Sequence, residues 1–139
     1  TWTETSAGNG RISNWYGIAS SSDGTKLAAV ACCRAQNDGG NPWTSADAGR
    51  TWTERPVGSF GQNWEGIASS SDGTMLAAVI YGENIWTSTD SGVSWRETST
   101  GSPQQWRGIS LSSDGMKIAA VVEGGSIWTS DRTWRLPCC

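Results

Sequence analysis

The sequence of 139 residues lacks histidine altogether and contains a single phenylalanine. Without histidine, the chain cannot assemble the Ser–His or Cys–His pairs that activate nucleophiles in many hydrolases. It also has no run of roughly 18 apolar residues, the length that a membrane-spanning helix requires. The residues after Thr1 do not form a basic and apolar leader, so we expect any export signal to have been removed already.

Positive charge is also scarce. Ten Lys and Arg residues stand against 13 Asp and Glu residues, which gives a formal net charge of -3. Phosphate backbones and anionic membranes are bound by basic surfaces. We therefore expect neither nucleic acid nor a membrane among the partners of this protein.

Small and aromatic residues take the place of the scarce aliphatic ones. The chain has 10 Trp and 18 Gly. Tryptophan buries a large apolar area per residue, and glycine permits tight turns. This composition is typical of an all-β protein with short strands.

Four cysteines form two adjacent pairs, Cys32 with Cys33 and Cys138 with Cys139. An even number of cysteines in a small chain indicates disulfides and an oxidising, extracellular compartment. Adjacent cysteines rarely bond to each other because the geometry is strained. We therefore expect bonds across the two pairs or between chains, with free thiols as the alternative. Because no histidine or Cys-x-x-Cys spacing is present, we predict neither a metal site nor a cofactor.

An internal repeat dominates the sequence. Three nearly identical segments of the form Trp-x-Gly-Ile-x-x-Ser-Ser-Asp-Gly, each followed by an apolar run, span residues 15–30, 64–79 and 106–121. A second motif, in which Trp-Thr-Ser precedes an Asp and another Trp, spans residues 43–52 and 86–95 and, shortened, 128–134. A period of about 42 residues is the signature of a repeat architecture.

Each repeat contains four short strand patterns separated by turn signals. Gly17–Ser20 is a strand of small residues suited to a crowded axis, and the Ser-Asp-Gly that follows predicts a tight hairpin. Lys26–Ala31 is apolar enough to be buried on both faces, and Ile85–Ser88 alternates as a half-buried strand does. A turn over Thr89–Gly92 and a last strand over Ser94–Glu97 complete the unit. Four meandering strands per repeat predict the blade of a β-propeller.

The second motif resembles the Asp box, Ser-x-Asp-x-Gly-x-[Ser/Thr]-Trp, of BNR repeats. That family of propellers includes sialidases, sortilin-type receptors, several lectins and photosystem assembly factors. The third copy departs from the pattern, because the segment that ends at Trp134 lacks the glycine. We expect a structural role for these residues, with the aspartate binding its own turn and the tryptophan packing inward; calcium binding is the alternative. The residues concerned are Asp47, Gly49, Trp52, Asp90, Gly92 and Trp95.

The number of blades poses a problem. Thr1–Glu4 matches the fourth strand at Thr51–Glu54, so the chain is expected to open with a closing strand. Propellers close with roughly four to eight blades, so three cannot form a ring. We expect a homo-oligomer that completes the ring, with a fragment of a longer array as one alternative and a β-trefoil as another. The predicted divisions are a closing strand over residues 1–4 and blades over residues 15–54, 64–97 and 106–136.

Nothing in the sequence marks a catalytic site. Resemblance to sialidases implies three clustered arginines, a Tyr–Glu nucleophile pair and an acidic Asp. Tyr16 and Tyr81 have no evident Glu partner, although Glu83 is close to Tyr81 in sequence. We therefore predict a protein that is not an enzyme, and a degenerate glycosidase is the remote alternative.

Binding is the more credible activity. The segments before each first strand and after each second strand vary against a constant scaffold, and they carry polar and aromatic side chains suited to sugars. Our main hypothesis is an extracellular module that self-assembles through its blades; a multivalent lectin that binds glycans, with one weak site per blade, is the alternative. Inter-blade packing and solvated loops compete with ligand binding at every one of these positions. The candidate ligand-binding residues are Trp15, Trp64, Trp106, Asn63, Gln105 and Tyr81.

Overall fold

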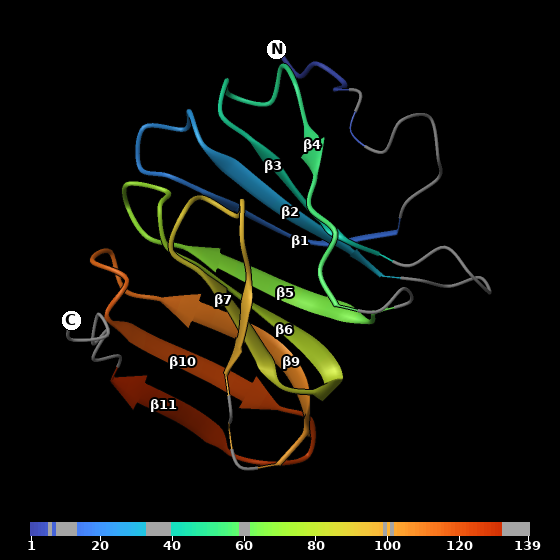
Figure 1. Ribbon diagram of the computed structural model, residues 1–139, viewed down its shortest axis with the longest axis vertical. Helices are drawn as coiled ribbons and strands as arrows, with labels where there is room; N and C mark the ends of the chain where they lie inside the picture. The colour runs from blue at the N-terminus through green and yellow to red at the C-terminus, as the bar shows by residue number, and fades with distance from the viewer. Residues whose placement is uncertain are drawn as a thin grey trace.

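A computed structural model describes residues 1–5, 7, 14–32, 40–58, 62–98, 100 and 102–131. These residues form eleven antiparallel β-strands that make three consecutive meanders, contained in one four-stranded and one seven-stranded sheet (Figure 1). Within these ranges, no helix has the length and apolar character needed to cross a membrane. The all-β fold predicted from the composition is confirmed.

Each repeat folds into a meander in which successive strands are neighbours. Blade 1 is a sheet in the order β1-β2-β3-β4. Its strands are β1 (Asn14–Ser20), β2 (Leu27–Cys32), β3 (Pro42–Ser45) and β4 (Thr53–Glu54). Blade 2 repeats this pattern with β5 (Trp64–Ser69), β6 (Leu76–Glu83), β7 (Ile85–Ser88) and β8 (Arg96–Thr98). Blade 3 contains β9 (Gln104–Leu111), β10 (Lys117–Val122) and β11 (Ile127–Asp131).

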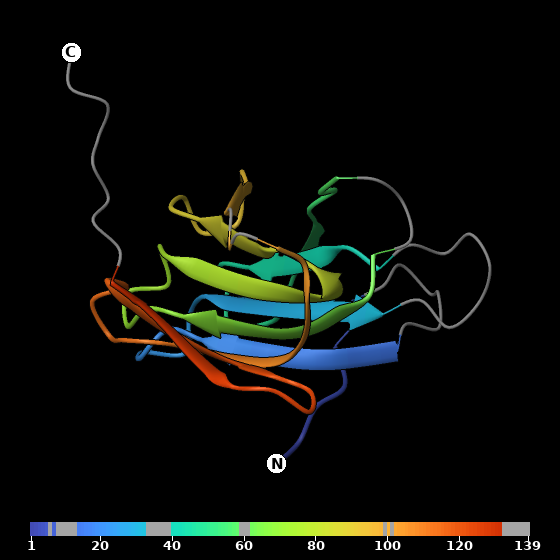
Figure 2. The ribbon, with the colours of Figure 1, turned by 90° about the horizontal axis from the view of Figure 1, so that it is seen from below.

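The first and last strands of the predicted series are not among the strands that the structure describes. The fourth strand of blade 3, expected near residues 133–136, lies outside the described residues. Residues 1–5 form no strand in this single chain, and Trp2 is fully exposed. In Figure 2 these dark blue residues extend away from β1. A closing strand over residues 1–4 would need a further blade to pair with, so it stays a prediction.

Ser-Asp-Gly turns form the hairpins between the first two strands of each blade. In blade 1, Asp23 Oδ1 accepts hydrogen bonds from the Thr25 amide at 3.0 Å and the Ser21 hydroxyl at 2.7 Å. Gly24 has a φ of 73°, a left-handed conformation that favours glycine. The same turn closes the hairpins of blades 2 and 3, which explains why these residues recur.

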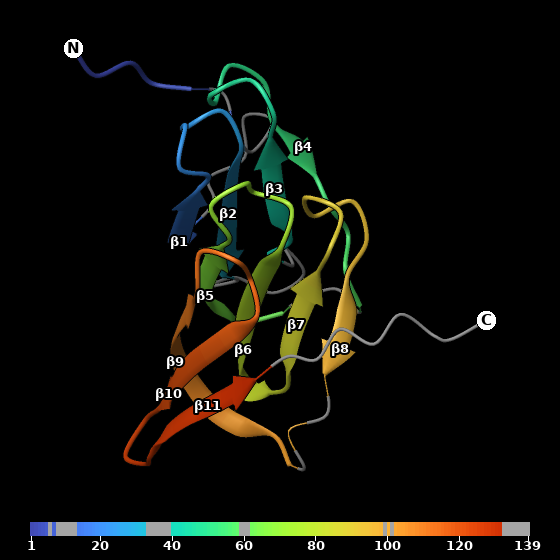
Figure 3. The ribbon, with the colours of Figure 1, turned by 90° about the vertical axis from the view of Figure 1, so that its left-hand side faces the viewer.

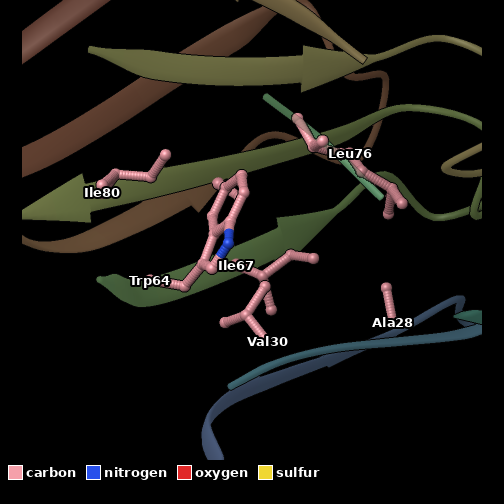
Figure 4. Packing of buried hydrophobic residues seen from close by; sticks show 8 residues of the cluster. Ala28, Val30, Trp64, Ile67, Leu76 and Ile80 are labelled. Carbon is pink, nitrogen blue, oxygen red and sulfur yellow. The ribbon is translucent and has the colours of Figure 1, made fainter. Parts of the chain in front are cut away.

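The blades stack face to face, and the core lies between them. Figure 3 shows β1, β5 and β9 along one side of the molecule, with β4 and β8 along the other. One cluster joins blades 1 and 2, where Val30 points toward Ile67 and Trp64 (Figure 4). A second cluster joins blades 2 and 3 around Val79 and Trp106. Leu76–Ile80 of β6 is therefore buried on both faces, as the apolar run predicted.

Backbone contacts bring the blades close together near their first strands. A Cβ atom on Gly17 would lie 3.2 Å from Gly66 Cα, so β1 and β5 approach as the small-residue strand predicted. The hairpin turns are linked as well, since the Ser22 amide donates to Ser71 O at 2.7 Å and the Ser71 amide to Ser113 O at 2.8 Å. Three separate meanders stacked in this way are propeller blades, and the threefold barrel of a β-trefoil does not describe them.

Candidate functional site

The turns that carry the repeated Asp are held by their own hydrogen bonds. Asp47 Oδ1 accepts from the Ser45 hydroxyl at 2.8 Å and the Thr51 amide at 2.9 Å, and Oδ2 accepts from the Thr51 hydroxyl at 2.6 Å. The Trp52 indole donates to Gly49 O at 3.1 Å. Asp90 receives the corresponding bonds from Ser88 and Ser94. The carboxylate oxygens of Asp47 and Asp90 therefore accept hydrogen bonds from within their own turns.

Hydrogen bonding also fixes the charge of these aspartates. The hydroxyl and amide of Thr51 donate to Asp47 and lower the pKa of its carboxyl to about 2. Gly49 and Gly92 adopt φ values of 83° and 84°, the left-handed conformation that glycine accepts without strain. Ala48 and Ser91 are left-handed too, with φ of 58° and 60°, which was not expected for residues that carry a side chain.

The three recurring tryptophans do not share one environment. Trp64 and Trp106 are 0% exposed, and their indole N–H groups donate to Gly40 O at 2.8 Å and Glu83 O at 3.0 Å in the preceding blade. Neither ring has a face on which a sugar could stack, so both residues pack between blades. Trp15 is 42% exposed, and its ring lies edge-on to that of Trp43, with 6.3 Å between the ring centroids.

The other predicted ligand residues lie where first strands begin and second strands end. Tyr81 of β6 is paired with Gln105 of β9, which joins blade 2 to blade 3. The Tyr81 amide donates to Asn63 O at 2.9 Å, so Asn63 is fixed by the same strand end. The Asn63 side chain turns toward blade 1, where Oδ1 lies 3.4 Å from the Cys32 thiol. The structure thus brings Tyr81 and Gln105 together, and it joins Asn63 to Tyr81 through the backbone while the Asn63 side chain faces blade 1.

A polar cluster surrounds Tyr81, and we call it the Arg107 cluster. It consists of Tyr81, Arg107, Glu65 and Glu123. The Arg107 guanidinium lies 4.6 Å above the Tyr81 ring. It pairs with Glu65 at 3.2 Å and Glu123 at 2.9 Å, and the Tyr81 hydroxyl donates to Glu123 at 3.1 Å. This last hydrogen bond raises the pKa of Tyr81.

Sequence reasoning missed this cluster, although a signal for it exists. Tyr16, Glu65 and Arg107 each follow the recurring tryptophan directly, so aligned repeats place three unlike side chains at one position. The partner of Tyr81 in this structure is Glu123, from the next blade, whereas sequence proximity suggested Glu83. Repeat alignment finds the variable position, but only packing brings adjacent blades into contact.

The two outer blade faces are exposed at positions that are buried inside the stack. We call the outer face of blade 1 around Trp15 and Ile18 the leading face. Ile18 is 68% exposed, whereas Ile67, its counterpart in blade 2, is 8% exposed. A hollow of about 410 Å³ lies on this face, lined by Trp15, Ile18, Trp52 and neighbouring residues.

We call the outer face of blade 3 around Val121 and Ile127 the trailing face. Val121 is 42% exposed, whereas Val79, its counterpart in blade 2, is 0% exposed. Ile127 is 74% exposed against 7% for Ile85. The same side chains that are core within the stack therefore lie in solvent at its two ends.

The predictions about metals and disulfides fall partly on the described residues. Within the described ranges, no group of three or more His, Cys, Asp or Glu residues could hold a metal ion. Cys33, Cys138 and Cys139 lie outside these ranges. The predicted pairing of the cysteines therefore stays a prediction.

Comparison with known proteins identifies the fold but no family. No protein-family model and no curated protein matches the sequence. Among solved structures, a GH74 xyloglucanase from Xanthomonas campestris is 20% identical, with a TM-score of 0.70 over 92% of this chain and 22% of its own. YCF48 from Cyanidioschyzon merolae is 20% identical, with a TM-score of 0.63 over 85% of this chain and 34% of its own. A chain of a nidogen/laminin complex is 17% identical, with a TM-score of 0.66 over 84% of this chain and 44% of its own.

These neighbours are β-propellers, and the predicted propeller fold is confirmed. The chain spans less than half the length of each. At these identities the likeness shows the fold alone.

Proposed function

We propose that this protein is a non-catalytic interaction module that associates with further copies of itself through its leading and trailing faces. One observation carries the proposal: Trp15 is 42% exposed while Trp64 and Trp106, at the same repeat position, are 0% exposed. A blade face built for packing gains apolar burial when a second blade covers it. The turn hydrogen bonds around Asp47 further support membership of the Asp-box type of repeat.

Sedimentation equilibrium over a wide range of protein concentrations tests this proposal. We expect a mass that is a multiple of the chain mass at micromolar concentration and that falls on dilution. Addition of reductant separates assembly through faces from assembly through disulfides, because face contacts persist when disulfides are reduced. A particle that has the mass of one chain at every concentration would contradict self-association.

The state of the Arg107 cluster supports a role without catalysis. The hydrogen bond from the Tyr81 hydroxyl to Glu123 raises the pKa of Tyr81, so the phenol holds its proton more firmly than a nucleophile should. Arg107 is already paired with two carboxylates, which compete with any substrate carboxylate. We expect no turnover of a fluorogenic sialoside or of xyloglucan. Turnover that disappears in Tyr81→Phe would refute this part of the proposal.

Carbohydrate binding is the second candidate function, and the Arg107 cluster favours it. The cluster combines an aromatic ring with exposed polar groups, which is the mixture that sugar hydroxyls require. Burial of Trp64 and Trp106 argues against one site per blade, and the Arg107 cluster places the candidate site between blades 2 and 3. A glycan array tests it: we expect binding that Arg107→Met removes and that Ser102→Ala, as a surface control, retains. A blank array would exclude this candidate.

An extracellular location is part of the same proposal. It rests on the four cysteines of the sequence. Comparison of reducing and non-reducing gels of protein secreted by a eukaryotic host checks it. We expect faster or slower migration without reductant, and identical migration would count against structural disulfides.

A further inference from the structure

The two internal junctions of the stack use the same three contacts. The first is a close approach of glycines in the first strands, where Gly17 meets Gly66 and Gly66 meets Gly108. The second is the serine ladder, in which an amide of one blade donates to a carbonyl of the next. The third is the indole of each later blade, which donates to a carbonyl just before the third strand of the earlier blade. A junction between blades is therefore defined residue by residue.

The two ends of the chain present the two halves of such a junction. On the trailing face, Gly108, the Ser113 amide and Gly125 occupy the positions that blades 1 and 2 offer to a following blade. On the leading face, Gly17 and Trp15 occupy the positions that blades 2 and 3 offer to a preceding blade. The faces differ from each other, and each is the complement of the other.

We propose that two copies of this chain dock head to tail, with the leading face of each on the trailing face of the other, in the register of the internal junctions. This inference rests on the proposed function and deepens it by naming the partner and the contacts. The Ser113 amide then donates to the carbonyl of Ser22 of the partner subunit. The indole of Trp15 of the partner subunit donates to Gly125 O, and Ile18 of the partner subunit packs on Val121.

Symmetry and blade number favour this arrangement over face-to-face dimers. Two copies joined head to tail have two equivalent junctions and six blades, within the roughly four to eight at which propellers close. Two leading faces placed together would bring serine carbonyls against each other, without the amide donor that completes the ladder. Two trailing faces would oppose amides in the same way. Only the head-to-tail pairing satisfies both groups.

Docking also completes a polar site at the junction. Inside the chain, Arg107 of blade 3 lies over Tyr81 and beside Glu65 of blade 2. Tyr16 holds the same repeat position as Arg107, so the junction places the partner's Tyr16 beside Glu123. The Arg107 cluster is thus extended by a residue of the second copy.

A mixing experiment with two variants tests the arrangement. Val121→Glu puts a carboxylate on the trailing face, and Ile18→Lys puts an ammonium on the leading face; both positions are exposed in the single chain, so folding is retained. Each variant alone buries a charge at both junctions, and we expect its dissociation constant to rise about a hundredfold. In a 1:1 mixture, a dimer of one chain of each variant has one wild-type junction and one junction in which the new carboxylate faces the new ammonium group. We therefore expect dimers to form again in the mixture. Val93→Glu, on an exposed valine of blade 2, is the matched control and should sediment as the wild type does.

The outcomes separate this inference from the proposed function. A wild-type protein that stays monomeric refutes both. A wild-type dimer that Val121→Glu leaves intact refutes the head-to-tail arrangement alone, because it shows that the trailing face is not used. A mixture that stays as dissociated as the two single variants also refutes it. We expect the circular dichroism spectra of both variants to match that of the wild type, which controls for loss of the fold.

Discussion

Replacement of Trp106 with alanine tests the packing between blades 2 and 3. The side chain is 0% exposed and belongs to the cluster with Val79, Ile85 and Ala120. A buried tryptophan removes about 150–250 Å² from water, worth roughly 4–6 kcal/mol at 25 cal/mol per Å². Measured losses for such truncations are about 3–5 kcal/mol. The hydrogen bond to Glu83 O adds about 1 kcal/mol.

The matched variant is Trp15→Ala, which removes the same residue from the same repeat position at the exposed end. With 42% of its surface exposed, Trp15 should contribute about 2–3 kcal/mol to the stability of the single chain. We therefore expect Trp106→Ala to lower the free energy of unfolding by about 2 kcal/mol more than Trp15→Ala. Near the midpoint of thermal unfolding this gap corresponds to roughly 8 °C.

Urea unfolding followed by circular dichroism measures the difference. It should be carried out at protein concentrations low enough to dissociate any oligomer, because association would also stabilise Trp15. Equal slopes of free energy against urea would show that both variants unfold from equally compact states. Equal losses of stability in the two variants would refute the distinction between internal junctions and end faces.

Three further predictions follow from single sites. Hydrogen bonds lower the pKa of Asp47 from 3.8 to about 2, so its stabilising effect is present above pH 3.8 and lost toward pH 2; Asp47→Asn should flatten acid unfolding over that window. Arg107→Met should lower the stability measured by urea titration in dilute buffer, and the loss should be smaller in 1 M salt because salt screens the ion pairs with Glu65 and Glu123. Gly92→Ala should lower the melting temperature more than Gly24→Ala, because both are left-handed but only Gly92 would clash, at 2.6 Å from Thr44.

Local chemistry alone determined the blade in this protein. Asp-Gly and Asp-x-Gly turns are short-range devices, since each closes with hydrogen bonds inside a handful of residues. Their spacing therefore predicts the strands, the hairpins and the buried run over Leu76–Ile80 before any tertiary contact is considered. The roles expected for Asp47 and Gly49 belong to the same class, because their partners lie within the turn.

Tertiary structure decided which copies of a repeated residue are buried. Trp15 and Trp64 have almost the same local sequence, but only Trp64 has a blade in front of it, so the sequence could not separate packing from ligand binding. The Arg107 cluster depends in the same way on contact between blades 2 and 3, across residues far apart in the chain. The repeat determines what a blade is, whereas the stack determines which faces remain for a partner.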